Sequence, residues 1–448
     1  PSIPETQSIE QFLSENYEFR SAQDILAEIN AFISLFPDHL QKNYAHPIDA
    51  LGIDLGLDET GKLWLFEVNT TPDAEYFNNK MYSMAMDYGV HLINPKKNRI
   101  PNKSMTIGMF TTSARVNELK LACAALSSLK GYNFFYFRPQ DINFDNKEIL
   151  GYQYINGEWL RKTFNYLEEI DVVYDRVRRK GVRKYQKYYK ELSHIIFTHE
   201  NSCIPINKFI VEKKLKKDTT VQKWLIPSVS YTMDRMIEYL KKYEAVIAKP
   251  QVDSYGRGLY LIKIKDSSNV IVYNKHDRIE LNFEELKIWL DKNFSSRKYI
   301  IQPYIQSRTK EDSPSDVRVH LSRNGQGKWA FLEIYPRIGI EYQKITPMTQ
   351  GGYRGKWKGF AIHQYGLEGY KALTKELKDT SLKFIKAFEQ AFATKLSEVG
   401  LDFLIDENQK VYFLEINVRQ PGIAMYDFRL AKEVLDYANY LFQSNFKA

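Results

Sequence analysis

Short apolar runs and one helical repeat of apolar positions open the larger part of the chain. Residues 105–110, 132–137 and 170–174 are apolar runs of strand length, and apolar residues recur with helical spacing over 116–129. Strand, helix and strand at this spacing predict a parallel α/β domain over 105–200.

Antiparallel pairs dominate the pattern that follows. Segments 246–248 and 259–264 flank a glycine-containing turn and predict a hairpin, and 317–321 and 329–334 predict a second strand pair. Further elements are a strand at 299–301, a long helix at 374–396, a strand pair at 401–405 and 411–416, and a last helix at 428–441. Together these elements predict a mixed α/β (α+β) protein.

An internal repeat is the most informative feature of the sequence. Residues 52–69 match residues 400–417 at 7 of 18 positions, and most other positions keep their apolar character. A predicted helix precedes each copy, at 22–41 and 374–396. The first 95 residues therefore look like a second copy of the last 80 or so.

Composition narrows the class of protein. The chain has 448 residues, which suggests about three domains. Its two cysteines fit a reducing cytoplasm and exclude a cysteine-rich metal site. No apolar run approaches the ~20 residues that a membrane helix needs, and the amino-terminal residues show no signal-peptide pattern.

Charge is divided unevenly along the chain. The net charge is +8, but residues 1–95 carry −11 and the remainder carries +19. Two prolines and four basic residues in 94–103 predict a linker at 96–104. The basic part suits an acidic substrate, a nucleotide or nucleic acid.

Three oxygen-bearing side chains converge on the last predicted strand pair. Glu415 and Asn417 share one face of their strand, Asp402 lies across the hairpin, and Tyr412, Leu414 and Ile416 should occupy the other face. Such a triad suits Mg²⁺ or Mn²⁺ with open positions for phosphate oxygens. The alternative is a solvated polar face.

Basic residues and turns upstream complete a pattern that no single motif establishes. Lys249 ends an apolar strand before a Ser/Gly turn that can present backbone N–H groups to phosphate, and Lys208 opens a helical segment. Taken singly, the turn and the strand end are better explained as ordinary structural features, and Lys208 alone carries no signal. The same pattern includes Ser254, Gly256 and Gly258 of the turn, Gln302 before Pro303, Asp316-Val317-Arg318 and Arg337.

In this order, these residues resemble the ATP-grasp superfamily over 105–448. The 13-residue spacing from Asp402 to Glu415 is similar to that of D-alanine–D-alanine ligase-like members. The segment from Asp171 to Arg176 resembles the YheC/YheD group, called endospore coat-associated.

The resemblance implies a role for each residue. Lys208 and Lys249 would hold the α and β phosphates of ATP, and Arg318 and Arg337 would stabilise the transferring phosphoryl group and an acyl phosphate. The remaining assignments are the Ser254–Gly258 turn for the β and γ phosphates, Gln302 with the backbone of Tyr304 and Ile305 for adenine, and Asp402, Glu415 and Asn417 for two Mg²⁺ ions. Asp253 and Tyr255 make the turn more acidic and bulkier than usual, and Arg419 either binds an acceptor carboxylate or packs.

The implied organisation is an ATP-grasp fold behind a parallel α/β domain. The segments are a non-catalytic partial repeat at 1–95, a linker at 96–104, the α/β domain at 105–200, and two ATP-grasp subdomains at 201–300 and 301–448. The repeat lacks counterparts of the lysines and Gln302, so it cannot grip ATP alone. It is either a docking module or the tail of an upstream tandem half, and a homo-oligomer is a further option.

The implied activity is ATP- and Mg²⁺-dependent ligation of a carboxylate to an amine, in the cytoplasm or associated with spores. The alternatives are a nucleotide-binding assembly protein and an ATP-grasp phosphotransferase. The expected substrates are a small molecule, a peptide or an acidic carboxylate, together with an amine. No membrane is expected among its partners. The basic stretch 176–190 has three interpretations: a solvated face, an acidic-substrate rim or, least favoured, a nucleic-acid patch. The histidines are predicted to be structural or on the surface.

Overall fold

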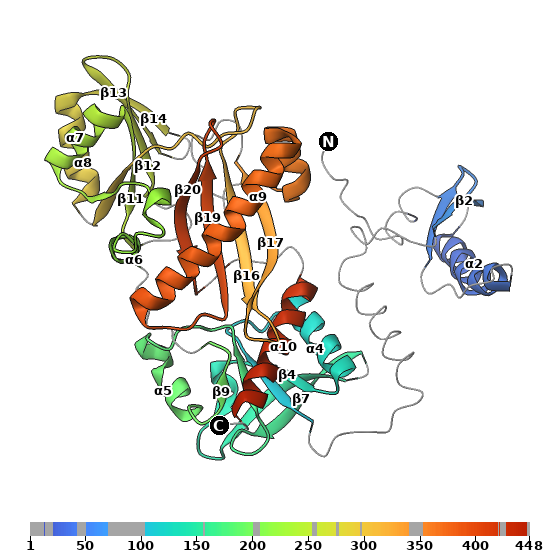
Figure 1. The fold of residues 1–448 in the computed structure, drawn as a ribbon. Helices are drawn as coiled ribbons and strands as arrows, with labels where there is room; N and C mark the ends of the chain where they lie inside the picture. Colours follow the sequence, from blue (N-terminus) through green and yellow to red (C-terminus); the bar gives the residue numbers. More distant parts are fainter. Residues whose placement is uncertain are drawn as a thin grey trace. The chain divides into compact units, whose positions relative to one another are not determined.

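The chain forms two compact units, which divide between Arg99 and Ile100 (Figure 1). The computed structural model describes residue 13 and residues 21–42, 51–69, 104–155, 157–199, 207–252, 258–274, 277–295, 298–339, 353–419, 421 and 427–445. Over these ranges, no helix is both long enough and apolar enough to cross a bilayer.

The first unit contains a helix and a hairpin. Its elements are α2 (Ala22–Lys42), β1 (Gly52–Leu57) and β2 (Leu63–Asn69), with β1 antiparallel to β2. Ile25 and Ile29 lie one turn apart on α2, so they share a face and are buried with Leu13. Leu55, Leu57 and Leu63 of the hairpin pack against this small core.

The second unit begins with the predicted α/β domain. Its elements are β3 (Thr106–Phe110), α4 (Glu118–Lys130), β4 (Asn133–Phe137), β5 (Ile142–Asn143), β6 (Glu148–Ile155), β7 (Glu158–Asn165), β8 (Val172–Asp175), α5 (Arg183–Glu191) and β9 (Ile196–Phe197). Strands β4, β3, β8 and β9 are parallel neighbours in that order. The β6–β7 hairpin adds antiparallel strands beside β4, which the sequence pattern did not predict.

A six-stranded antiparallel sheet follows. Its elements are α6 (Lys208–Leu215), β10 (Val229–Ser230), α7 (Met233–Tyr243), β11 (Ala245–Pro250), β12 (Tyr260–Ile264), β13 (Asn269–Asn274), β14 (Asp277–Asn282), α8 (Phe283–Phe294) and β15 (Tyr299–Pro303). Val246 and Ala248 of β11 are buried in the core that α7 and α8 form with this sheet. Since side chains alternate along a strand, Lys249 lies on the opposite face.

A five-stranded antiparallel sheet completes the unit. Its elements are β16 (Ser315–Arg323), β17 (Trp329–Ile338), β18 (Tyr353–Arg354), α9 (Trp357–Phe392), β19 (Glu398–Ile405), β20 (Val411–Asn417) and α10 (Asp427–Asn445). Val317, Val319 and Leu321 of β16 pack with α9, which crosses the sheet (Figure 1). The other face of β16 therefore carries Arg318 and His320.

The two repeated hairpins have the same geometry. Asp54 pairs with Glu67 and Asp402 with Glu415, and in both hairpins the register shifts directly after the aspartate. The turns also match, because the Asp58 carboxylate accepts the Lys62 N–H at 3.1 Å and the Asp406 carboxylate accepts the Lys410 N–H at 2.9 Å.

Because of the register shift, the side chains of β20 do not alternate as predicted. Val411 and Phe413 lie in the α9 core, together with Ile416 on the far side of the bulge. Tyr412 and Leu414 were expected on that face, and for them the prediction is wrong, because one extra residue inverts the alternation.

Candidate active site

Strands β19 and β20 bring the predicted oxygen triad together. Asp402 and Glu415 are register partners, and the Asn417 Nδ2 donates to Asp402 Oδ2 at 3.1 Å and to Glu415 Oε1 at 3.2 Å. Asp402 is fully buried, whereas Glu415 and Asn417 are half-buried, so the triad is only partly open to solvent. Over the described ranges, no three Asp, Glu, His or Cys side chains gather as a metal site, so an ion here would rely on the amide oxygen or on further ligands.

Both predicted arginines contact Asp402. The Arg318 guanidinium donates from Nε and Nη2 to the two carboxylate oxygens of Asp402, at 2.6 and 2.7 Å. Arg337 lies on the next strand, β17, with its Nη2 3.0 Å from Asp402 Oδ2 and its Nε bonded to Asp316. Burial raises the pKa of Asp316 to about 6, although Arg337 lowers it. The fork of a guanidinium suits a planar, multiply charged oxygen group.

The two predicted lysines approach the triad from the preceding sheet and helix. The Asn207 side chain caps α6 by accepting from the backbone N–H groups of Phe209 and Ile210. Lys208, the first residue of α6, places its Nζ 2.9 Å from Glu415 Oε2. This ion pair joins the two subdomains directly at the triad.

Lys249 is buried at the carboxyl end of β11. Burial and, to a lesser extent, the nearby Lys208 lower the pKa of its ammonium to about 8. Glu415 lies close enough to favour the charged form, and Lys208 and Lys249 hold the pKa of Glu415 well below its usual range despite burial. Both lysines therefore act on Glu415, and Lys208 does so through a direct ion pair.

Gln302 belongs to the same cluster through a residue that the sequence pattern missed. Its Nε2 donates to Glu212 Oε2 at 3.1 Å, and Ser228 donates to the other oxygen of Glu212. Glu212 follows Lys208 by one helical turn of α6, so the two residues share a face of the helix. This four-residue spacing is the sequence signal that could have placed Glu212 in the cluster. Burial raises the pKa of Glu212.

The chain beyond Gln302 has its backbone partly engaged. The Tyr304 N–H donates to Ala245 O at 2.9 Å, and Ile305 O accepts from Ser307 N at 3.0 Å. These bonds engage the Tyr304 N–H and the Ile305 carbonyl, two of the backbone groups that the resemblance assigns to adenine.

The predicted phosphate turn is described only at its end. Ser254 and Gly256, with Asp253 and Tyr255, lie outside the described residues. Gly258 has φ +72°, and a Cβ there would lie 3.0 Å from Tyr299 Oη and 3.1 Å from Pro250 Cγ. The turn therefore closes on a position that favours glycine on both conformational and steric grounds.

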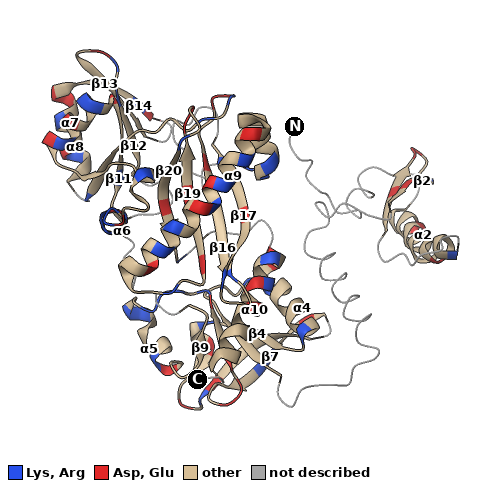
Figure 2. Ribbon diagram, in the orientation of Figure 1, with Lys and Arg blue, Asp and Glu red and all other residues tan. Residues whose placement is uncertain are grey.

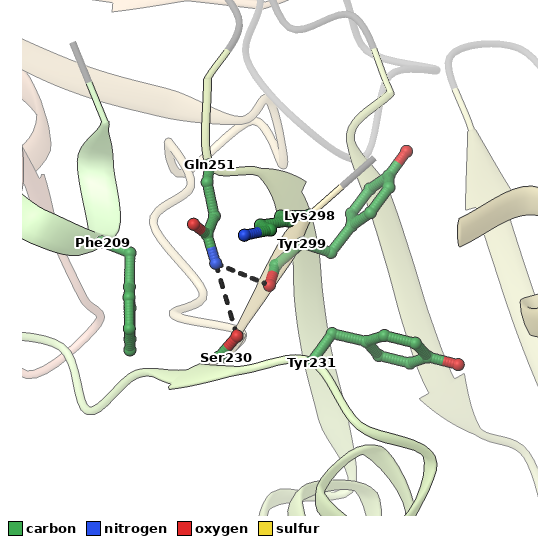
Figure 3. A pocket seen from close by; sticks show the side chains of 6 residues that line it. All are labelled: Phe209, Ser230, Tyr231, Gln251, Lys298 and Tyr299. Atoms are coloured by element: carbon green, nitrogen blue, oxygen red, sulfur yellow. Dashed lines mark hydrogen bonds between the residues drawn. The ribbon is translucent and has the colours of Figure 1, made fainter. Parts of the chain in front are cut away.

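A cavity of about 460 Å³ is lined by Phe209, Ser230, Tyr231, Gln251, Lys298 and Tyr299 (Figure 3). Phe209 directly follows Lys208 in the sequence, and Gln251 is two residues after Lys249. The Gln251 amide donates towards Ser230 Oγ and Tyr299 O at 3.4 and 3.5 Å, and its backbone O accepts the Lys208 N–H at 2.9 Å. Gln251 thereby links the wall of the cavity to the start of α6.

The basic stretch 176–190 separates into two sets. Along α5, Arg183, Lys184, Lys187 and Lys190 are exposed, as a solvated or substrate-facing surface requires (Figure 2). Arg178 is fully buried and pairs with Glu398, and Arg176 pairs with the same carboxylate. For these two arginines the prediction of a solvated face is wrong, because a buried carboxylate distant in sequence attracts them.

This chain is similar to a known protein family, to two curated proteins and to solved structures. A family described as YheC/D-like ATP-grasp matches residues 4–92 and 197–441, and each matched segment contains one of the repeated hairpins. The endospore coat-associated protein YheD of Bacillus subtilis (strain 168) is 23% identical over 327 residues, which are 68% of this chain and 70% of YheD. The endospore coat-associated protein YheC of the same organism is 22% identical over 315 residues, which are 65% of this chain and 81% of YheC. Among solved structures, the VanG D-Ala:D-Ser ligase from Enterococcus faecalis aligns over 76% of this chain and all of its own, with 11% identity and a TM-score of 0.46.

Proposed function

Since this chain belongs to the YheC/D-like ATP-grasp family, we propose that it is an ATP- and Mg²⁺-dependent ligase that joins a carboxylate to an amine. The observation that carries the proposal is the meeting of Lys208 and Glu415 at 2.9 Å, beside the buried Lys249. Cations on one subdomain and carboxylates on the other are the two halves of a site for a metal-bound polyphosphate.

The nucleotide would lie between the two antiparallel sheets. Lys208 and Lys249 would hold its phosphates as point charges, and Gln302 with the chain at 304–305 would hold its base. Lys208 would then exchange its contact with Glu415 for a phosphate oxygen, which frees the carboxylate.

Asp402, Glu415 and Asn417 fit Mg²⁺ by their chemistry, because two carboxylates and an amide offer hard oxygen ligands. Bound there, the ion would neutralise charge on the phosphate oxygens. Asn417 would turn its amide so that the oxygen faces the carboxylates, while Arg318 holds the orientation of Asp402.

The reaction proposed has two steps. A substrate carboxylate oxygen attacks the γ-phosphorus, the bond to the β-phosphate oxygen breaks, and ADP leaves. The amine nitrogen then attacks the acyl carbon, phosphate leaves with the C–O bond electrons, and the amine loses a proton. Arg318 and Arg337 would stabilise the charge on the transferring group, because their guanidinium groups are fixed in advance by buried carboxylates.

The exposed Arg183 and lysines of α5 favour an acidic substrate or peptide. The cytoplasm is the proposed location, with spore association as the alternative, since both curated relatives are named endospore coat-associated. The same name favours a second candidate function, a nucleotide-binding assembly protein without ligase activity.

The first 95 residues are proposed to be a non-catalytic partial repeat. In this unit Asp54 and Glu67 are exposed, whereas Asp402 is buried among arginines. With the half-buried Asn69, these two carboxylates would bind Mg²⁺ weakly, because the ion depends on substrate phosphates to complete its shell.

A substrate screen tests the proposed activity. Amino acids, short peptides and acidic polymers are paired with amines, and phosphate release and product mass are measured. ADP formation that requires both a carboxylate and an amine supports the ligase, and a stable phosphorylated hydroxyl product would instead establish a phosphotransferase. Nucleotide binding without turnover across the screen favours the assembly protein.

A further inference from the structure

One face of the last sheet carries a buried polar row that runs away from the triad. On β16 the row consists of Arg318, His320 and Ser322, and all three are buried. On β19 it continues from Asp402 through Gly400 to Glu398, each paired with its neighbour on β16. The candidate active site occupies one end of the row, and Glu398 occupies the other.

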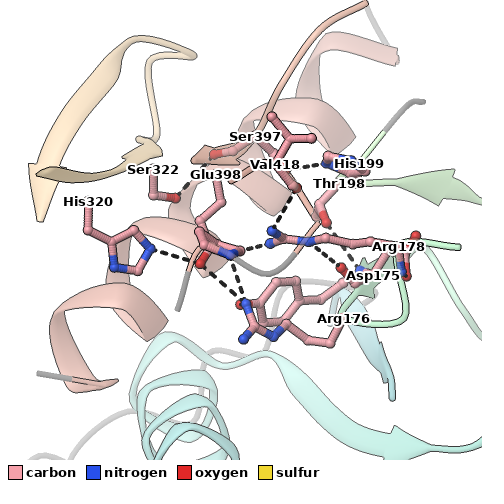
Figure 4. Close-up of polar contacts among 12 residues, drawn as sticks. Asp175, Arg176, Arg178, Thr198, His199, His320, Ser322, Ser397, Glu398 and Val418 are labelled. Carbon is pink, nitrogen blue, oxygen red and sulfur yellow. Dashed lines mark hydrogen bonds and ion pairs between the residues drawn. The ribbon is translucent and has the colours of Figure 1, made fainter. Parts of the chain in front are cut away.

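Glu398 joins this row to the α/β domain (Figure 4). Its carboxylate accepts from Arg176 Nη1 at 2.9 Å and from Arg178 Nη2, and His320 Nε2 lies 2.9 Å from its other oxygen. Both Glu398 and Arg178 are 1% exposed. The two arginines follow β8 directly, at the carboxyl edge of the parallel strands.

Arg178 is held in an unusual backbone conformation. Its φ is +49°, in the left-handed region that residues other than glycine rarely adopt. Its N–H donates to Asp175 Oδ1 at 2.8 Å and its Nε to Asp175 O at 3.1 Å, while Tyr189 donates to the same carboxylate. Local contacts thus fix this side chain so that it points out of its own domain.

The arginine also reaches the segment that follows the triad. Its Nη1 lies 3.5 Å from Val418 O, and Val418 is the residue after Asn417. Three residues farther on, Pro421 O accepts from Arg318 Nη1 at 2.9 Å. Gly400 lies beneath this segment, and a Cβ there would lie 2.5 Å from Pro421 O. Arg178 from the α/β domain therefore contacts the chain at Val418, and Arg318 at the active site bonds to it at Pro421.

We propose that Arg178 is a positioning residue that sets the orientation of Asn417 and the β19–β20 hairpin from the α/β domain. The inference rests on the proposed function for its catalytic consequence. The hairpin carries the whole oxygen triad, and Arg178 contacts it at Glu398, near the start of β19, and directly after β20. A displacement of the α/β domain consequently moves the triad relative to the lysines on β11 and α6.

The test compares Arg178→Lys with Lys130→Met in the full chain. Lysine keeps the charge beside Glu398 but loses the fork that reaches Val418 O and Asp175 O together. The control, Lys130→Met, removes the ion pair between Lys130 Nζ on α4 and Asp436 Oδ1 on α10, which are 2.7 Å apart. This pair also joins the α/β domain to the last helix, but it contacts no residue of the polar row. Glu398→Gln is the second variant, because it leaves the contacts of Arg178 with Asp175 in place.

Hydrogen exchange of residues 411–419 is the readout that needs no substrate. We expect exchange there to accelerate at least about tenfold in Arg178→Lys and in Glu398→Gln and to stay unchanged in Lys130→Met. Turnover should fall about 100-fold in Arg178→Lys and in Glu398→Gln and should stay within about twofold of wild type in Lys130→Met.

Unchanged exchange at 411–419 in both Arg178→Lys and Glu398→Gln would overturn the proposal. So would exchange that rises equally in β11, since that result would mark a general loss of stability. If wild-type protein shows no ligase turnover but the local exchange response appears, the proposed function fails and the positioning role stands.

Discussion

Lys249 provides a test of the nucleotide site through pH alone. Burial and Lys208 lower its pKa to about 8 in the nucleotide-free protein, and phosphate oxygens would favour its charged form. The free protein therefore has to take up a proton to bind nucleotide above pH 8. The protonated fraction of a group with this pKa falls from about nine-tenths at pH 7 to about one-tenth at pH 9, so nucleotide affinity should fall about tenfold over that range.

The matched variant is Lys249→Arg, whose guanidinium stays charged at every pH tested. The Kd of a non-hydrolysable ATP analogue in excess Mg²⁺ is measured by calorimetry at pH 7, 8 and 9, in buffers of different ionisation enthalpy. The wild type should take up about half a proton near pH 8, and the arginine variant should take up less. Equal pH dependence in the two proteins would refute the assignment of Lys249 to the phosphates.

The other predictions concern single contacts and the first unit. Glu415→Gln should reduce ADP release about 100-fold or more while the melting temperature stays near that of wild type, because it removes one charged ligand and one ion pair; turnover at the wild-type rate would contradict the assignment. Gly258→Ala should lower the melting temperature and weaken nucleotide binding, because φ +72° strains alanine by about 1 kcal/mol; unchanged values would show that the turn adapts. A chain of residues 96–448 should still bind nucleotide, and Glu67→Gln in the full chain should leave turnover unchanged. Loss of binding in a folded 96–448 protein would show that the first unit contributes to the site.

The sequence predicted those parts of the fold whose signals are local. The parallel strands β3, β4 and β8 and the pairs β11–β12, β16–β17 and β19–β20 were all expected from apolar runs and turns. The helix predicted at 374–396 is the later part of α9, which starts at Trp357 and changes direction at Gly366. The helical spacing of apolar residues predicted this later part, but the sequence pattern predicted neither the kink nor the helical turns before residue 374.

The features that the sequence did not predict depend on long-range contacts. The bulge after Asp402 arises from one extra residue on β20, and apolar residues on both faces of that strand concealed it. The burial of Arg178 depends on Glu398, 220 residues later, and a run of basic residues looks the same whether or not a distant carboxylate pairs with it. The triad itself was predictable, because two-residue spacing and a hairpin turn place its members without any distant contact.

The central claim is that the triad and the facing lysines convert ATP, a carboxylate and an amine into ADP, phosphate and an amide. Its most direct test is simultaneous measurement of ADP and product mass with the full chain, Mg²⁺ and the substrate panel, for wild type and Glu415→Gln. The account predicts ADP and an amide product in equal amounts, dependent on both substrates and lost in the variant. A phosphorylated product, or ADP formation that Glu415→Gln retains, would contradict it.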